Sequence, residues 1–260
     1  MAQTGQITFY ENVFSPFSHR VHIALGQAQA KYSRVSINLA DKPAWFAEKV
    51  NPVGKVPAII YGDPQSAPES PPPEAAKINE SLVILEFLAD LFPEAHLIPS
   101  DPVLRARVRL FINTFETGKF FEGFRGFFFR NSEGAGSLLL EGLAEIQARL
   151  PPTGFLVGKW SNAESAAAPF LVRVDMMLKY DIGAYSKEDG SKVLEAYQGP
   201  RYDRLAKYIV DIKESPIFRT TWDEVNPPLH YFELQGMLLT TKYQDANREL
   251  WRRHPATQRK

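Results

Sequence analysis

Hydrophobic residues in the N-terminal part of the chain follow two different periods, and these predict alternating strands and helices. Alternating or β-branched runs predict strands over 7–10, 32–39 and 56–61, with a short edge strand over 77–79. Helical spacing predicts one helix from Phe17 onward and another over 81–91, with a short helical or irregular segment over 41–50. The order β-α-β followed by β-β-α predicts a small α/β domain with a mixed sheet.

Beyond a proline-containing linker over 93–102, the apolar spacing is helical only. Ser161, with Glu164 three residues later, predicts a capping box at the start of one helix. Pro169 inside that helix predicts a kink or an early break. We therefore expect an α/β domain over 1–95 and an all-helical domain over 103–260. The helical stripes are Leu104, Val108, Phe111 and Phe115; Leu139, Leu143, Ile146 and Leu150; and Leu205, Tyr208, Ile209 and Ile212.

The composition is that of an ordinary globular protein and excludes several classes of function. Hydrophobic residues make up 44% of the 260 residues, and 30 Lys and Arg balance 30 Asp and Glu. A formal net charge of zero argues against nucleic acid as a partner. No apolar run approaches the ~20 residues that a membrane span needs, and no secretory signal is visible. With no cysteine available for disulfides, a cytoplasmic protein is expected.

Two histidines have a spacing that permits metal binding. His19 and His22 lie three residues apart in the first predicted helix. No third ligand cluster accompanies them, so they are predicted to be surface histidines, and no metal is expected.

Candidate chemistry lies at Ser15-Pro16-Phe17, where the first strand leads into the first helix. Small domains that handle thiols often have Cys at the position of Ser15, but this chain has no cysteine. Any thiol must therefore come from outside the protein, and Ser15 can only donate a hydrogen bond to it. The alternative is structural, because Ser is a preferred N-cap and Pro a preferred first helical residue.

Four elements, in order along the chain, resemble those of the cytosolic glutathione transferases. They are Ser15-Pro16-Phe17, then Asn51-Pro52-Val53-Gly54-Lys55-Val56-Pro57, then Ile78-Asn79-Glu80-Ser81, and finally the capped helix start at Ser161–Glu164. Together with 41–46, the first element is most similar to the omega class, including its fungal members, over roughly residues 5–225. Omega enzymes usually carry Cys where Ser15 stands, so their thiol-transferase and dehydroascorbate reductase chemistry is not expected here. The proline-rich loop over 62–76 is also longer than a simple turn.

The resemblance implies a fold and a set of partners. The fold is a thioredoxin-like α/β domain that binds glutathione, followed by an all-α domain that lines the site for the electrophile or ligand. It also implies a homodimer that uses glutathione as co-substrate and hydrophobic small molecules as partners. The activity that we predict is transfer of glutathione to hydrophobic, aromatic electrophiles, as in detoxification, with possible peroxidase chemistry.

Within the first domain, the resemblance also implies a role for each site residue. Ser15 would stabilise the glutathione thiolate, and the N-terminus of the following helix would add to this effect. Val56, before a cis Pro57, would pair with the cysteinyl backbone. Glu80 and Ser81 would bind the γ-glutamyl ammonium and carboxylate. Lys42, or more weakly Lys55, would bind the glycyl carboxylate, and Phe17 and Leu39 would supply apolar contact.

Each of these residues also has a structural alternative. Pro57 could be an ordinary edge-strand proline, Ser81 an N-cap and Lys42 one of many solvated lysines. Phe17 and Leu39 could belong to the core. In the second domain, the expected ligand-site aromatics could equally be core residues. They are Phe124, Phe127, Phe128, Tyr180 and Trp222, with Tyr185 as a further candidate.

Three other functions remain open. The fold could act as a ligandin, a carrier of aromatic or phenolic ligands with little turnover. It could serve only to dimerise or to dock other proteins. It could also cleave aryl ethers with glutathione, releasing a phenol.

Overall fold

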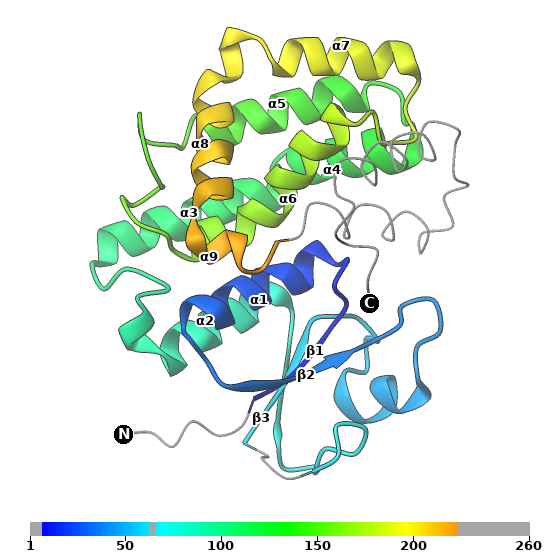
Figure 1. Ribbon diagram of the computed structural model, residues 1–260, viewed down its shortest axis with the longest axis vertical. Coiled ribbons are helices and arrows are strands. Elements are labelled where there is room, and N and C mark those ends of the chain that lie inside the picture. Colours follow the sequence, from blue (N-terminus) through cyan, green and yellow to red (C-terminus); the bar gives the residue numbers. More distant parts are fainter. Residues whose placement is uncertain (1–6, 63–65, 223–260) are drawn as a thin grey trace. The chain divides into compact units, whose positions relative to one another are not determined.

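The computed structural model describes residues 7–62 and 66–222. The chain forms two compact units, Met1–Leu97 and Ile98–Lys260, here called the N-terminal unit and the C-terminal unit. The first is α/β and the described part of the second is all-helical (Figure 1), which confirms the predicted fold class.

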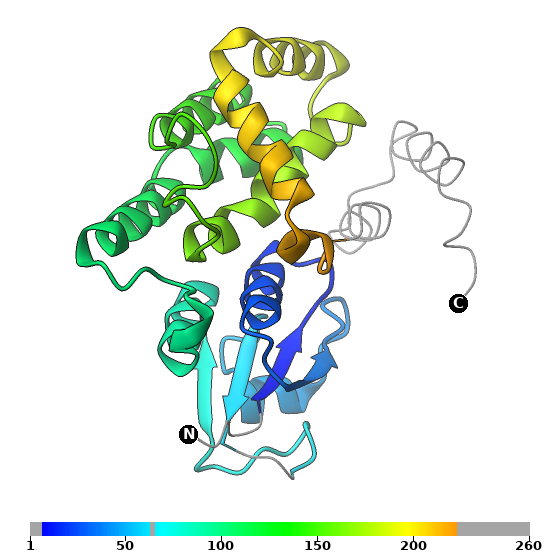
Figure 2. The same ribbon diagram turned by 60° about the vertical axis from the view of Figure 1, so that its left-hand side comes forward.

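A four-stranded mixed sheet forms the centre of the N-terminal unit. Its strands are β1 (Ile7–Glu11), β2 (Tyr32–Ser36), β3 (Ala58–Tyr61) and β4 (Ala76–Asn79). They lie side by side in the order β2-β1-β3-β4 (Figure 2), so the predicted short strand is indeed an edge strand. β1 pairs with β2 in parallel and with β3 in antiparallel orientation, and β3 pairs with β4 in antiparallel orientation.

Both faces of the sheet are covered. The helices α1 (Pro16–Gln27) and α2 (Ser81–Leu91) lie on one side, and the π-helical turn η1 (Phe46–Val50) lies on the other (Figure 1). Successive residues of β1 and β3 therefore point to opposite faces of the sheet and pack into two separate cores, because the side chains of a strand alternate in direction. A 3-10 turn, η2 (Pro93–Ala95), follows α2. The core on the η1 side is made of Tyr10, Ile37, Phe46, Val50, Ala58 and Ile60.

Two predicted strands are longer than the observed ones. The strand predicted over 32–39 ends at Ser36, because its partner β1 ends at Glu11; one further bond joins the Ile37 N–H to the Glu11 carbonyl, at 2.8 Å. The strand predicted over 56–61 begins at Ala58, because the preceding Pro57 has no N–H to donate to a ladder. The helix predicted over 81–91 is observed with the same bounds.

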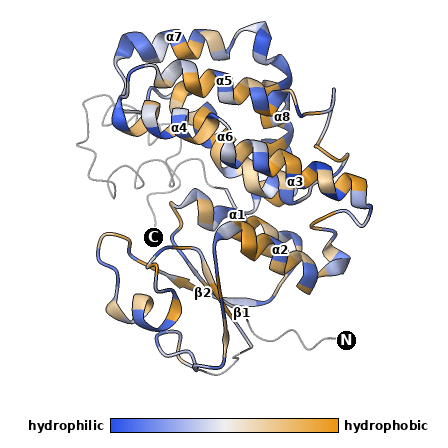
Figure 3. Ribbon diagram, turned by 180° about the vertical axis from the view of Figure 1, so that it is seen from behind, coloured by the Kyte–Doolittle hydropathy of each residue, from blue (hydrophilic) through white to orange (hydrophobic). Residues whose placement is uncertain are grey.

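The described part of the C-terminal unit consists of helices joined by mostly short connections, with a longer one over residues 148–161. Figure 3 shows hydrophobic and hydrophilic residues on α8, whose Leu205, Tyr208, Ile209 and Ile212 are buried, as its predicted stripe requires. The elements are α3 (Pro102–Thr117), α4 (Phe120–Arg125), η3 (Gly126–Arg130), α5 (Ala135–Gln147), α6 (Asn162–Lys179), α7 (Lys187–Tyr197), η4 (Pro200–Tyr202), α8 (Asp203–Glu214) and α9 (Pro216–Arg219).

Among the described helices of this unit, α6 is the most deeply buried. Its predicted capping box is present, with Ser161 as N-cap and Glu164 as the reciprocal partner. The predicted early break at Pro169 is wrong, because the helix continues to Lys179. Burial of almost every α6 side chain outweighs the cost of the missing N–H, and the Arg173 guanidinium donates to the Pro169 carbonyl at 2.7 Å. Within the described residues, no helix is both long and apolar enough to span a membrane.

The two histidines of α1 are not surface residues, contrary to the prediction. His19 is only 6% exposed and His22 is half-buried, because α1 packs against the sheet and α2. Burial, and secondly the positive charge of Arg34, lowers the pKa of His22 from 6.5 to about 4.

A pH dependence of stability follows from His22. The folded state keeps this imidazole neutral, so its contribution is present above the ordinary pKa of 6.5 and is lost as the pH falls toward about 4. We expect the urea midpoint of unfolding to decrease as the pH is lowered from 6.5 to about 4. In a His22→Gln variant, this midpoint should decrease less steeply with pH. His96→Asn, at an exposed site, is the control and should follow the wild type. Equal slopes for wild type and His22→Gln would contradict the prediction.

Candidate functional site

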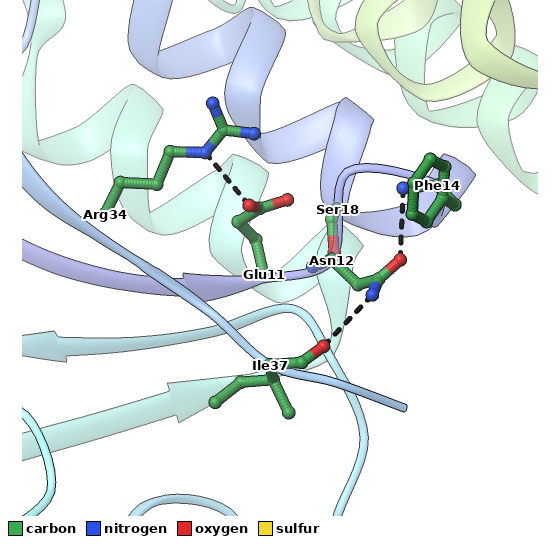
Figure 4. Close-up of polar contacts among 6 residues, drawn as sticks. All are labelled: Glu11, Asn12, Phe14, Ser18, Arg34 and Ile37. Atoms are coloured by element: carbon green, nitrogen blue, oxygen red, sulfur yellow. Dashed lines mark hydrogen bonds and ion pairs between the residues drawn. The ribbon is translucent and has the colours of Figure 1, made fainter. Parts of the chain in front are cut away.

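The loop between β1 and α1 is held in shape by a buried asparagine (Figure 4). The Asn12 side chain donates to the Ile37 carbonyl at 3.0 Å and accepts from the Phe14 N–H at 3.1 Å. Its backbone N–H donates to the Ser18 hydroxyl at 3.3 Å, and its carbonyl accepts from the Ser15 N–H at 2.9 Å. Asn12 thus links the loop to the segment after β2 and to the first turn of α1. These two links, together with the bond from the Ser15 N–H to the Asn12 carbonyl, position Ser15.

Ser15 is the N-cap of α1 and is 6% exposed. Its hydroxyl oxygen accepts from the Ser18 N–H at 3.2 Å, and Pro16 occupies the first helical position. A serine hydroxyl has one donor and two acceptor positions, so capping uses a lone pair and leaves the O–H able to donate. The N-terminus of α1 adds the positive end of the helix dipole. The cap and the stabilisation of a nearby anion are therefore compatible roles for this residue.

A tight turn leads into β3. The Asn51 side chain donates to the Lys55 carbonyl at 2.7 Å and accepts from the Val53 N–H at 3.2 Å. Gly54, whose N–H donates to the Asn51 carbonyl at 2.7 Å, has a φ of +65°, a conformation that favours glycine. The Val56–Pro57 peptide bond that follows is cis, as the resemblance implies.

The start of α2 combines an unusual backbone with a buried cation. Glu80, which is exposed, has a φ of 67° and a ψ of 115°, a conformation that is costly for a residue with a Cβ and is often found at functional sites. Ser81 begins the helix and is 7% exposed, and its hydroxyl accepts from the Arg20 guanidinium at 3.2 Å. The free N–H groups of the first turn of α2 can bind an anion.

Arg20 was not identified from the sequence, and neither was Asn12. Arg20 is 1% exposed, and its guanidinium lies 5.3 Å from the centroid of the half-buried Phe17 ring. The available signal was an arginine three residues after Phe17, on the face of a helix whose other positions are largely apolar. For Asn12, the signal was an asparagine just after a buried strand, a residue type that bonds to nearby backbone.

Lys42 and Leu39 lie on the segment after β2. The Lys42 ammonium donates to the Gly54 carbonyl at 3.2 Å, which brings it beside the turn before Val56. An ammonium has three donors, so Lys42 can also bind a carboxylate. Leu39 is half-buried and packs against the core on the η1 side, as its structural alternative expects.

The register of the sheet places several chain segments in one row. Tyr10 pairs with Ala58, and Ala58 pairs with Asn79. The end of β1, the start of β3 and the end of β4 therefore lie side by side. The last pair between β1 and β2, Glu11 with Ser36, lies at the same end.

All the predicted glutathione contacts are on segments that leave or enter the sheet at this end. The structure therefore gathers these segments, although which side chains contact a ligand stays a prediction. Ser15 and Phe17 follow β1, Leu39 and Lys42 follow β2, Val56 and Pro57 precede β3, and Glu80 and Ser81 follow β4.

The predicted ligand-site aromatics all lie in the C-terminal unit. Phe124, Phe127 and Phe128 are at most 4% exposed. They belong to a cluster of rings in which Phe127 stacks on Tyr185 with 4.3 Å between the ring centroids. This burial matches their alternative role as core residues, and contact with a ligand stays a prediction for them.

Tyr180 and Trp222 are half-buried and so more accessible. The Lys179 ammonium lies 4.9 Å from the Tyr180 ring centroid, and Trp222 stacks on Phe218 at 5.5 Å. Their role at a ligand site is likewise a prediction.

Comparisons with known proteins identify similar sequences and structures. The family profile of the glutathione S-transferase N-terminal domain matches residues 14–91. The structure of glutathione transferase Omega 2S from Trametes versicolor in complex with 2,4-dihydroxybenzophenone is 46% identical, covering 84% of this chain and 94% of that one, with a TM-score of 0.79. Omega 1C from the same fungus is 40% identical, covering 88% and 96%, with a TM-score of 0.82.

Curated relatives align over shorter stretches. Pyrimidodiazepine synthase of Drosophila melanogaster is 38% identical over 48% of this chain and 48% of its own length. Glutathione S-transferase omega-1 of Mus musculus is 32% identical over 43% of this chain and 41% of its own length. The chain thus spans about half the length of these curated relatives or somewhat less. The match to the Trametes structures, at 40–46% identity over more than four fifths of this chain, shows that the chain belongs to the glutathione transferase family, with omega-class homologues.

Proposed function

We propose that this protein transfers glutathione to hydrophobic, aromatic electrophiles, and that the Ser15 hydroxyl stabilises the glutathione thiolate. The observation that carries the proposal is the placement of Ser15 as N-cap of α1, where its oxygen accepts from the Ser18 N–H and its O–H can donate to sulfur. Accepting a hydrogen bond polarises a hydroxyl and makes it a better donor.

The energetic requirement is modest. A free cysteine-type thiol has a pKa near ~8.5, so only a few per cent is thiolate at neutral pH. Lowering this pKa by about two units needs ~2.7 kcal/mol of differential stabilisation. One hydrogen bond to a charged group contributes ~1.5–3 kcal/mol, and a helix N-terminus adds ~0.3–1 kcal/mol. Together these two effects supply ~1.8–4 kcal/mol, a range that includes the requirement.

The rest of the tripeptide is assigned to the segments at the same end of the sheet. The N-terminus of α2, with Ser81 and the neighbouring Arg20 charge, suits the γ-glutamyl carboxylate, and the exposed Glu80 suits its ammonium. The backbone of Val56 suits the cysteinyl unit. Lys42 suits the glycyl carboxylate.

In the reaction, the thiol proton leaves to solvent and the thiolate attacks an electrophilic carbon. The sulfur–carbon bond forms, and the leaving group departs with its electron pair. The aromatic class of electrophile is supported by the ring-rich C-terminal unit and by the benzophenone held in the Trametes Omega 2S structure. We further propose that the protein acts as a cytoplasmic homodimer without a metal.

The test is the ultraviolet thiolate absorbance of bound glutathione as a function of pH. We expect an apparent pKa well below the ~8.5 of a free thiol. Binding with an unshifted pKa would contradict thiolate activation and favour a ligand carrier. Failure of the folded protein to bind glutathione would contradict the proposal as a whole and favour an interaction protein.

A further inference from the structure

The chain contains three Ser-Pro dipeptides, at Ser15, Ser70 and Ser215, and no Thr-Pro. Ser15 and Ser215 are the N-caps of α1 and α9, where they are 6% and 9% exposed and are followed by the first helical proline. Ser70 lies outside any helix or strand and is exposed. The three dipeptides therefore differ in the structure: Ser15 and Ser215 are buried helix caps, whereas Ser70 is exposed to solvent.

The loop that carries Ser70 is fastened to the N-terminal unit on both sides of this residue. The Tyr10 hydroxyl donates to the Pro68 carbonyl at 2.6 Å. Pro71 is buried, and Ala75 packs against the core on the η1 side. Ser70 closes a turn in which its N–H donates to the Ala67 carbonyl at 2.8 Å. Because a protein kinase binds its substrate in an extended form, this turn must open before Ser70 can be phosphorylated.

A lysine lies beside the Ser70 hydroxyl. The Lys49 ammonium, on the last turn of η1, lies 3.4 Å from the Ser70 oxygen, and both residues are exposed. A phosphate at this oxygen carries ~1.5–2 negative charges and three acceptor oxygens. Lys49 is placed to pair with it, against repulsion from Glu69 and Glu74 of the same loop.

We propose that Ser70 is a phosphorylation site for a proline-directed protein kinase, and that its phosphate pairs with Lys49. ATP supplies the phosphoryl group: the bond from the Ser70 oxygen to the γ-phosphorus forms, and the bond from that phosphorus to the bridging oxygen breaks. ADP leaves, and the hydroxyl proton passes to the catalytic carboxylate of the kinase. Pro71 suits such a kinase because it has no N–H that would need an acceptor in the substrate groove. This proposal is independent of the glutathione activity.

The test treats the folded 260-residue chain with an activated mitogen-activated protein kinase and with a cyclin-dependent kinase, each with Mg-ATP. Peptides that span each Ser-Pro dipeptide serve as positive controls. Mass spectrometry is expected to locate one phosphoryl group at Ser70 in the wild type and in the matched Ser215→Ala variant, and none in Ser70→Ala. Incorporation at the other dipeptides instead, or phosphorylation of the Ser70 peptide but not of the folded chain, would overturn the proposal.

Two further variants test the structural details. Tyr10→Phe removes the bond to Pro68, and we expect it to raise the rate of Ser70 phosphorylation several-fold; an unchanged rate would contradict the anchoring role. Phosphorus NMR titration reports the pairing with Lys49, because an adjacent ammonium favours the dianion. The second ionisation of the phosphate should move to higher pH in Lys49→Gln but not in Lys77→Gln, an exposed lysine of β4. Identical titrations in all three proteins would overturn the pairing.

Discussion

Replacing Glu164 by Ala is expected to lower the free energy of unfolding by about 3–5 kcal/mol, because four buried donors lose their acceptor and each unsatisfied buried donor costs ~1–3 kcal/mol before the structure relaxes. Glu164 is 0% exposed. Its carboxylate accepts from the Leu156 N–H at 2.8 Å and from the Tyr208 hydroxyl at 2.9 Å. It also accepts from the N–H and the hydroxyl of Ser161, both at 2.9 Å. The substitution leaves these donors buried and without an acceptor.

Urea denaturation followed by circular dichroism measures the effect. Glu188→Ala is the matched control, because Glu188 forms an exposed ion pair with Lys192 one helical turn away, and such pairs contribute about 0.5 kcal/mol or less. Glu164→Gln keeps one acceptor oxygen and should give an intermediate loss. A loss below about 1 kcal/mol for Glu164→Ala would show that water or a shift of α6 satisfies the donors.

Ser15→Ala is expected to lower kcat/KM for glutathione transfer by about 100-fold, which corresponds to ~2.7 kcal/mol of transition-state stabilisation. The thiolate pKa of bound glutathione should rise toward that of the free thiol, because the only remaining stabilisation is the helix N-terminus. The variant also loses an N-cap, which costs about 1 kcal/mol of stability. Steady-state kinetics and the thiolate titration measure the two effects on the reaction.

The loss of stability needs its own control. Ser186→Ala removes an N-cap from α7, where the Ser186 hydroxyl accepts from the Asp189 N–H at 3.1 Å. It should lower stability by a similar amount and leave kcat/KM and the thiolate pKa unchanged. Ser15→Thr keeps a hydroxyl and should retain most of the activity. If Ser15→Ala leaves the thiolate pKa unchanged, the residue is a cap only.

The sequence predicts those features of the fold that are determined by residues close together in the chain. The helix over 81–91 keeps its predicted bounds because its apolar period and its flanking residues agree. The capping box at Ser161 is as expected because its two partners are three residues apart. The break predicted at Pro169 is wrong because burial of α6, which depends on the packing of the whole C-terminal unit, outweighs the low helix propensity of proline.

At the site, the missed residues act over long sequence distances. The Asn12 side chain bonds to a carbonyl 25 residues away, and Arg20 bonds to Ser81, which is 61 residues away. Neither pairing leaves a periodic signal. The motif residues could be identified because they lie within short elements, but the groups that orient them become visible only when the strands pair.

The paired residues Tyr10, Ala58 and Asn79 determine which mutations the backbone at this end of the sheet can tolerate. Because main-chain ladders hold the four segments, a slip of β3 by two residues would carry Val56 and Pro57 roughly 7 Å away from their neighbours. Side chains at this end, by contrast, can be exchanged without moving the backbone that presents them. We therefore expect a substitution at position 15 to change the chemistry that we propose for this residue while the backbone framework stays unaltered, so that a new activity would need a point mutation rather than a rebuilt fold.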